Sequence, residues 1–167
     1  DVFDSGDIPQ SQYRIEAYDI AHISGKDTVG VMVVLEDGEL ARNEYRKFKI
    51  KGVDGEVKVD DTKNLRELLT RRLGHAEWKL PNLIVLDGGV AQRNVAEAVL
   101  KAHGFSIEIA SVVKDERHTA KEIVGKTSTI QKHAKEILLL NSESHRFAQA
   151  YHANLRRRPY KIDKGKR

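Results

Sequence analysis

Residues 14–35 read RIEAYDIAHISGKDTVGVMVVL, a pattern that predicts two strands in succession. Residues 14–20 alternate between apolar and polar side chains, as in a half-buried strand. Residues 28–35 are mostly apolar and β-branched, which is typical of a strand buried on both faces. A turn signal at residues 36–39 leads into residues 40–50, where the alternation returns. We therefore expect a three-stranded antiparallel meander at the start of the fold.

Helical patterns alternate with two further strands after the meander. The expected elements are a helix from residues 60–61 to 73, a strand at 83–86, a helix at 91–103, a strand at 107–113 and a helical stretch at 131–156 with at most one break. Residues 114–129 are polar and loop-like. The order predicts an α/β fold with a mixed five-stranded sheet, three antiparallel strands followed by two parallel ones, flanked by helices on both faces. This pattern fits the ribonuclease H-like architecture, but a fold alone does not establish a function.

The composition is that of an ordinary globular domain. The chain has 167 residues, of which 40% are hydrophobic and 32% are charged. We expect a lead-in over residues 1–13, one domain over residues 14–157 and a basic tail over residues 158–167. No apolar run approaches the roughly 18 residues of a membrane span, so we expect no membrane association. Cysteine is absent, which excludes thiolate zinc sites and a cysteine nucleophile and suits a reducing cytoplasm.

The positive charge is concentrated at the end of the chain. The net charge is +4, yet residues 156–167 alone contain seven lysines and arginines against one aspartate. A basic tail of this kind is typical of proteins that contact phosphate backbones. A solvated, disordered end would have the same composition, so charge alone leaves both interpretations open.

Two aspartates lie where predicted strands end. Asp19 lies near the end of the first strand, and Asp87 follows the apolar run at residues 83–86 and precedes two glycines. The carboxyl ends of strands are where α/β sheets place ligands, although each aspartate could also belong to a simple turn. If the two strands are neighbours, the carboxylates approach each other, and a divalent cation would remove their repulsion. Oxygen ligands favour Mg²⁺ or Mn²⁺ over zinc.

His145 is the third candidate. It shares one face of the last predicted helix with Leu138, Asn141 and Ala148, because these residues recur at steps of three and four. A histidine on such a face is commonly a hydrogen-bonded core residue. It becomes a metal ligand or a general acid or base if the helix packs over the two aspartates.

Other charged residues are weaker candidates. Asp60 and Asp61 are most simply helix caps. Arg71 and Arg72 suit a solvated helix end, and could also hold backbone phosphate. Lys114 ends the last predicted strand.

Several blocks of the sequence resemble the C-terminal endonuclease domain of the UvrC family, the nuclease subunit of the bacterial excinuclease. The blocks are ordered and spaced as in the family and cover nearly the whole chain, from residue 13 to residue 157. They lie at residues 19–25, 28–30, 45–50, 60–61, 70–72 and 80–89, at Gln92, Asn94 and Glu143, and at residues 145–148, 151–152 and 155–156.

The resemblance implies a ribonuclease H-like fold with an Asp-Asp-His site. The family's catalytic residues fall on Asp19, Asp87 and His145, and a further acid implicated in catalysis falls on Asp61. The implied reaction is the metal-dependent hydrolysis of a DNA phosphodiester on the 5′ side of a lesion, in nucleotide excision repair, with Mg²⁺ or Mn²⁺. The implied partners are lesion-containing double-stranded DNA and, for a full-length member, UvrB. The expected DNA-binding residues are Arg71, Arg72, Lys114, Arg146, Arg156, Arg157 and Arg158.

The sequence also departs from the family pattern. Asn141 and Ser142 stand where the family has Arg-Asp, so an acid beside the site is missing and metal affinity or activity could be reduced. This motivates a second hypothesis, a non-catalytic DNA- or protein-binding module with a degenerate site. A third hypothesis is another ribonuclease H-like enzyme that acts on RNA·DNA hybrids or branched DNA. Because no GIY-YIG nuclease, UvrB-binding segment or helix-hairpin-helix pair is visible, we expect either an excised domain or a stand-alone one that binds DNA weakly.

Overall fold

The computed structural model of the protein describes residues 12–23, 27–52, 61–115, 117 and 121–157, the last seven without their side chains. Its elements are β1 (Arg14–Ile23), β2 (Asp27–Glu36), β3 (Glu39–Leu40), the 3-10 helix η1 (Arg42–Glu44), β4 (Arg46–Lys49), α1 (Asp61–Leu73), β5 (Leu83–Asp87), α2 (Val90–Ala102), β6 (Glu108–Lys114), β7 (Lys121–Val124) and α3 (Thr127–Arg157). None of the helices within these ranges combines the length and the apolar character that crossing a membrane requires.

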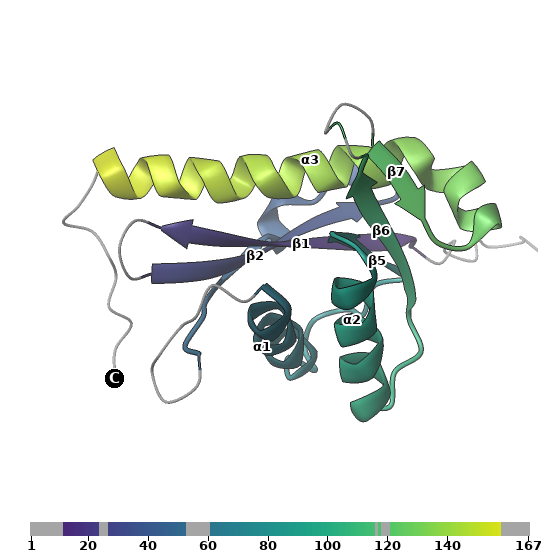
Figure 1. Ribbon diagram of the computed structural model, residues 1–167, viewed down its shortest axis with the longest axis horizontal. Helices are drawn as coiled ribbons and strands as arrows, with labels where there is room; N and C mark the ends of the chain where they lie inside the picture. The colour runs from purple at the N-terminus through teal and green to yellow at the C-terminus, as the bar shows by residue number, and fades with distance from the viewer. Residues whose placement is uncertain (1–11, 24–26, 53–60, 116, 118–120, 158–167) are drawn as a thin grey trace, which may run out of the picture.

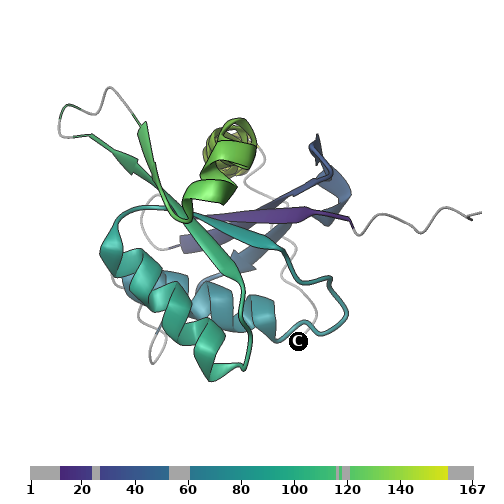
Figure 2. The same cartoon turned by 90° about the vertical axis from the view of Figure 1, so that its right-hand side faces the viewer.

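One mixed sheet organises the molecule, in the order β3-β2-β1-β5-β6-β7, with β4 also paired to β2. β1 pairs antiparallel with β2 and parallel with β5, and β5 pairs parallel with β6. α1 and α2 cover one face of the sheet and α3 covers the other (Figures 1 and 2). Each face buries its own apolar cluster, one beneath α1 and α2 and one beneath α3. The predicted α/β fold, a mixed sheet with helices on both faces, is confirmed (Figure 2).

The strand count differs from the five that the sequence predicts, because the described sheet has seven strands. The expected strand over residues 40–50 is interrupted by η1, where Arg42, Asn43 and Glu44 have no β-branched or apolar side chain to hold the ladder. β7 lies in the stretch that was expected to be a loop, and it pairs antiparallel with β6 from Ser111↔Val124 to Lys114↔Lys121. The last helix is continuous and begins at Thr127, before its expected start.

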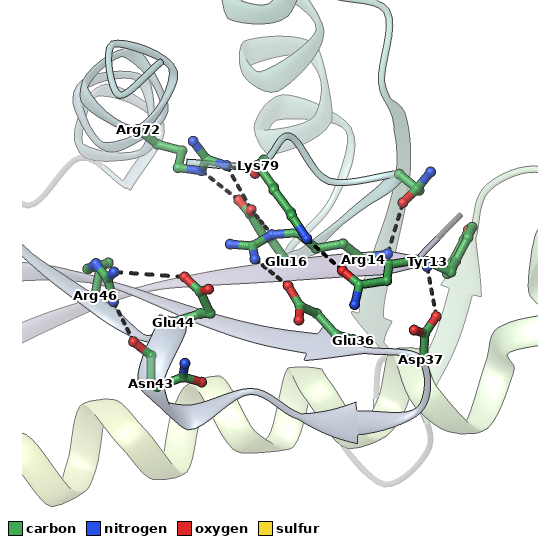
Figure 3. A network of polar contacts seen from close by, with 12 residues as sticks. Tyr13, Arg14, Glu16, Glu36, Asp37, Asn43, Glu44, Arg46, Arg72 and Lys79 are labelled. Atoms are coloured by element: carbon green, nitrogen blue, oxygen red, sulfur yellow. Dashed lines mark hydrogen bonds and ion pairs between the residues drawn. The ribbon is translucent and has the colours of Figure 1, made fainter. Parts of the chain in front are cut away.

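A fully buried ion cluster holds α1 against β1 (Figure 3). Arg72 of α1 places Nε 2.7 Å from Oε1 and Nη2 2.8 Å from Oε2 of Glu16, and Nη2 also donates to the carbonyl oxygen of Lys79 at 2.6 Å. The hydroxyl of Tyr18 and Nε of Arg14 donate to the same carboxylate. Arg72 and Glu16 are both 0% exposed. The expectation that Arg72 binds DNA or ends a solvated helix is therefore wrong, because its guanidinium is enclosed by its carboxylate partner.

Candidate active site

Strand pairing brings Asp19 and Asp87 together. Tyr18 of β1 is the register partner of Leu86 of β5, so the two aspartates occupy the next position on neighbouring parallel strands. Ala17 and Val85, two residues before each aspartate, belong to the cluster beneath α3. Because side chains alternate along a strand, both carboxylates point to the α3 face.

The glycine after Asp87 lets the chain turn sharply at the end of β5. Gly88 has φ 135°, a backbone conformation that L side chains rarely adopt. A Cβ atom there would also lie 2.8 Å from the Cδ atom of Gln92. Glycine therefore allows α2 to begin at Val90, directly after the site, and leaves the Asp87 carboxylate at the open end of the strand.

His145 reaches the two carboxylates from α3. Its Nδ1 lies 3.0 Å from Oδ2 of Asp19, and its Nε2 lies 3.5 Å from Oδ2 of Asp87. The neighbouring buried residues Ser144 and Ala148 face the sheet, which sets His145 at the side of the helix above the strand ends. Ligand atoms of the three residues all lie within 4.8 Å of one another. The three residues predicted as the centre of the site thus converge.

The two carboxylates of the group favour a positive charge between them. Hydrogen bonds to Asp19 and then to Asp87 raise the pKa of His145 to about 9, against the opposing effect of burial. The contact with His145 is also the main reason that the pKa of Asp87 lies below its usual value, with smaller contributions from Lys114 and Lys121. The imidazolium therefore offsets the repulsion between the carboxylates, and a divalent cation would do so more strongly.

Two residues of the group, Asp19 and His145, line a surface hollow of about 320 Å³. The polar residues that line it are Asp19, His22, His145 and Gln149, and the apolar ones are Ile20, Ala21 and Ala148. The side chains of Asp19, Asp87 and His145 are 18%, 30% and 31% exposed. A ligand can therefore approach the group from solvent without a rearrangement of the fold.

Asp61 is not part of this group. It begins α1, and its Oδ1 lies 3.1 Å from Nε2 of His22, whose Nδ1 lies 3.0 Å from Oγ1 of Thr28. His22 follows Asp19 by three residues on β1, so alternation points it to the α1 face rather than the α3 face. The structure therefore connects Asp61 to the hollow through His22 and does not bring it among the three converging residues.

The predicted DNA-binding residues are dispersed. Lys114 ends β6 two residues beyond Val112, the register partner of Asp87, and its charge helps to lower the pKa of the Asp87 carboxyl. Arg71 lies on the α1 side, where its Nη1 donates to the carbonyl oxygen of Lys49 and its guanidinium covers the ring of Phe48. Arg146 is 56% exposed and is held by Glu143 at 2.6 and 2.7 Å. Arg156 and Arg157 lie in α3 without described side chains, and Arg158 lies outside the described residues.

Sequence reasoning missed Lys121. It is the register partner of Lys114 across the β6–β7 hairpin. Its only sequence signal was the apolar pair Ile123-Val124, which follows it in an otherwise polar stretch and indicates a short strand.

The family and the curated relatives that match this chain agree with one another. Residues 4–153 match the family described as the UvrC RNase H endonuclease domain. The UvrABC system protein C of Caldicellulosiruptor saccharolyticus is 42% identical over 152 residues, 87% of this chain and 25% of that protein. The protein of the same name from Lachnospira eligens is 40% identical over 161 residues, 86% of this chain and 26% of that protein. The chain thus spans about a quarter of the length of these relatives.

A weaker likeness was found among solved structures. Endonuclease V of Ciona intestinalis, in complex with a 24mer DNA containing an inosine, is 17% identical, with a TM-score of 0.46. The match covers 75% of this chain and 55% of that one.

Proposed function

The chain belongs to the UvrC RNase H endonuclease domain family, and we propose that it is a divalent-metal-dependent endonuclease domain that hydrolyses a phosphodiester bond of DNA. The observation that carries this proposal is the convergence of Asp19, Asp87 and His145, which come from three elements. Asp19 and His145 also line a surface hollow. A histidine with only a structural role would be expected to make buried hydrogen bonds. His145 instead contacts two carboxylates that are partly exposed to solvent.

The side chains fit a divalent cation. Two carboxylate oxygens and one imidazole nitrogen within 4.8 Å of one another form an oxygen-rich ligand set, which suits Mg²⁺ or Mn²⁺. A cation bound there would polarise the scissile phosphate and lower the pKa of a water molecule. Asp19 and Asp87 would hold the cation, and His145 would either complete its ligand set or transfer a proton at Nε2 or Nδ1.

The finer assignment comes from the family. We place the incision on the 5′ side of a lesion in double-stranded DNA, within nucleotide excision repair in the cytoplasm. A UvrB-like protein would be the partner of the full-length protein. Basic side chains that contact only phosphates suit an enzyme that cuts beside damage in any sequence.

A second function is favoured by one departure from the family pattern, at Ser142. Ser142 lies on α3 one turn before His145, at the position where the family pattern has an acid, and its side chain is exposed. Asn141 before it is buried, and its Nδ2 has no hydrogen-bond partner among the residues that the structure describes. A site with one carboxylate fewer would bind metal less tightly, and a domain that had lost the reaction would remain as a DNA- or protein-binding module.

Nicking of duplex DNA with Mg²⁺ or Mn²⁺ tests the proposal. Asp19→Asn and Asp87→Asn are each expected to lower the rate by more than the roughly 10–100-fold that loss of an outer-shell partner costs. Glu97→Gln, an exposed acid on α2 on the other face of the sheet, is the matched control and should cut like the parent. Equal cutting by the aspartate variants would refute the site. If Mn²⁺ binds to none of the proteins, the binding-module alternative is supported instead.

A further inference from the structure

Two lysines lie directly opposite each other at the end of the β6–β7 hairpin. Lys114 is the last residue of β6, Lys121 is the first residue of β7, and the two are register partners. Side chains at opposed positions of an antiparallel pair have Cβ atoms about 4.5–5.5 Å apart. Both lysines are exposed, and neither forms an ion pair with another of the residues that the structure describes.

This lysine pair shares a face with the Asp-Asp-His group. Val112 is the register partner of Asp87 and belongs to the cluster beneath α3. Lys114 follows Val112 by two residues and therefore points to the same face, as does Lys121 opposite it. The hairpin rises beside α3 on the side of the sheet that carries this helix (Figure 2). The positive charges of both lysines also reach the Asp87 carboxylate, whose pKa they lower.

Local structure does not explain the pair. Like charges directly opposite each other destabilise a ladder, by up to about 1 kcal/mol. A lysine on β7, an edge strand, does protect against pairing with another chain. That protection needs only Lys121, and it gives no reason for a second lysine on β6, where it adds repulsion. An anion held between the two ammonium groups would remove the repulsion.

We propose that Lys114 and Lys121 form a phosphate-binding subsite that holds the backbone of the DNA strand beside Asp87. The inference rests on the proposed nuclease function and assigns it a substrate-positioning element. The two ammonium groups bind non-bridging phosphate oxygens and counter the repulsion that the site's carboxylates exert on DNA. They contact the backbone and not the bases, so the subsite is indifferent to sequence.

Salt dependence of DNA binding tests the subsite. A labelled duplex is titrated with the parent, Lys114→Gln, Lys121→Gln and the double variant, in chelator, and binding is followed by fluorescence anisotropy. The slope of log K against log[salt] is negative, and each lost phosphate contact should make it shallower by about 0.9. Between 50 and 200 mM salt the double variant should therefore lose about 12-fold less affinity than the parent. Arginine at both positions should restore most of the slope, since it also binds phosphate.

A matched control and a second readout complete the test. Lys101→Gln removes an exposed lysine from α2, on the opposite face of the sheet, and should keep the parental slope. Without DNA and at low salt, either glutamine variant should unfold at a higher temperature than the parent, because the repulsion is gone. Inorganic phosphate should reduce that difference. The inference is overturned if the double variant keeps the parental slope, or if the parent shows no binding at low salt.

These experiments distinguish failure of the lysine subsite from failure of the proposed nuclease function. A parent that binds DNA with a slope that depends on the lysines, but does not cut it, would refute the nuclease and leave the subsite standing. A parent that cuts, with the Michaelis constant unchanged in the double variant, would refute the subsite and leave the nuclease standing. Where both hold, the double variant should raise the Michaelis constant more than it lowers kcat.

Discussion

At the scale of single residues, the position of a side chain around its strand or helix decides its role. His145 and Arg146 are neighbours in α3, yet the first contacts Asp19 and the second pairs with Glu143. Arg71 and Arg72 are neighbours in α1, yet the first is partly exposed and the second is enclosed with Glu16. A difference of one residue rotates a side chain by about 100° around a helix. Adjacent residues of the same type therefore take unrelated roles.

Asp61 and His22 provide a prediction at this scale. Because Asp61 contacts His22 and does not lie among the three converging residues, we expect it to be a positioning residue. Asp61→Asn and His22→Gln should each lower the cutting rate, because His22 lines the hollow beside Asp19. The loss should be smaller than the roughly 10–100-fold cost of removing a hydrogen bond to a metal ligand, since the described contacts of His22 are with Thr28 and Asp61. The double variant should be little worse than either single one, since both changes break the same contact.

Metal binding distinguishes this role from direct ligation. The affinity for Mn²⁺, measured by titration calorimetry, should stay near the parental value in Asp61→Asn and fall sharply in Asp19→Asn. A loss of Mn²⁺ binding in Asp61→Asn equal to that in Asp19→Asn would make Asp61 a ligand and contradict the prediction.

At the scale of elements, buried charge fixes α1 on the sheet. Arg72 is the largest fully buried side chain among the described residues, and its partner Glu16 lies on β1, three residues before Asp19. Arg72→Ala leaves a buried carboxylate with fewer cationic partners, and breaking such a pair costs about 3–5 kcal/mol. We expect that loss in the free energy of unfolding, measured with urea.

The same helix provides the control for this prediction. Arg66 is exposed on α1, and Arg66→Ala should change the free energy of unfolding by about 0.5 kcal/mol or less. Where Arg72→Ala remains folded, its salt dependence of DNA binding should match that of the parent. A shallower slope at unchanged stability would show that Arg72 does contact phosphate.

At the scale of the whole molecule, the sequence predicted the strands and helices that have a clear periodicity. It missed contacts that arise only when strands pair. The aspartates were identifiable because each lies near the end of a strand. Whether β1 and β5 are neighbours stayed a condition in the sequence prediction, because three strands and α1 lie between them along the chain. β7 is four residues long, too short for a reliable alternation, so the pairing of Lys121 with Lys114 was invisible. Asp61 was assigned to the site only by resemblance, and its separation from the other acids depends on where the start of α1 packs against the sheet, which residue spacing does not show.

The converging group joins segments that are far apart along the chain, and this gives the last prediction. Asp19 lies on β1, Asp87 on β5 and His145 on α3, 126 residues beyond Asp19. An unfolded chain does not hold these ligands together, so a bound cation stabilises the folded state by mass action. At a Mn²⁺ concentration of 100 times its dissociation constant the gain should be about 2.7 kcal/mol. Thermal unfolding should therefore shift upward with Mn²⁺ in the parent and in Glu97→Gln, return with EDTA, and stay fixed in Asp87→Asn. An equal shift in Asp87→Asn would place the cation elsewhere on the molecule.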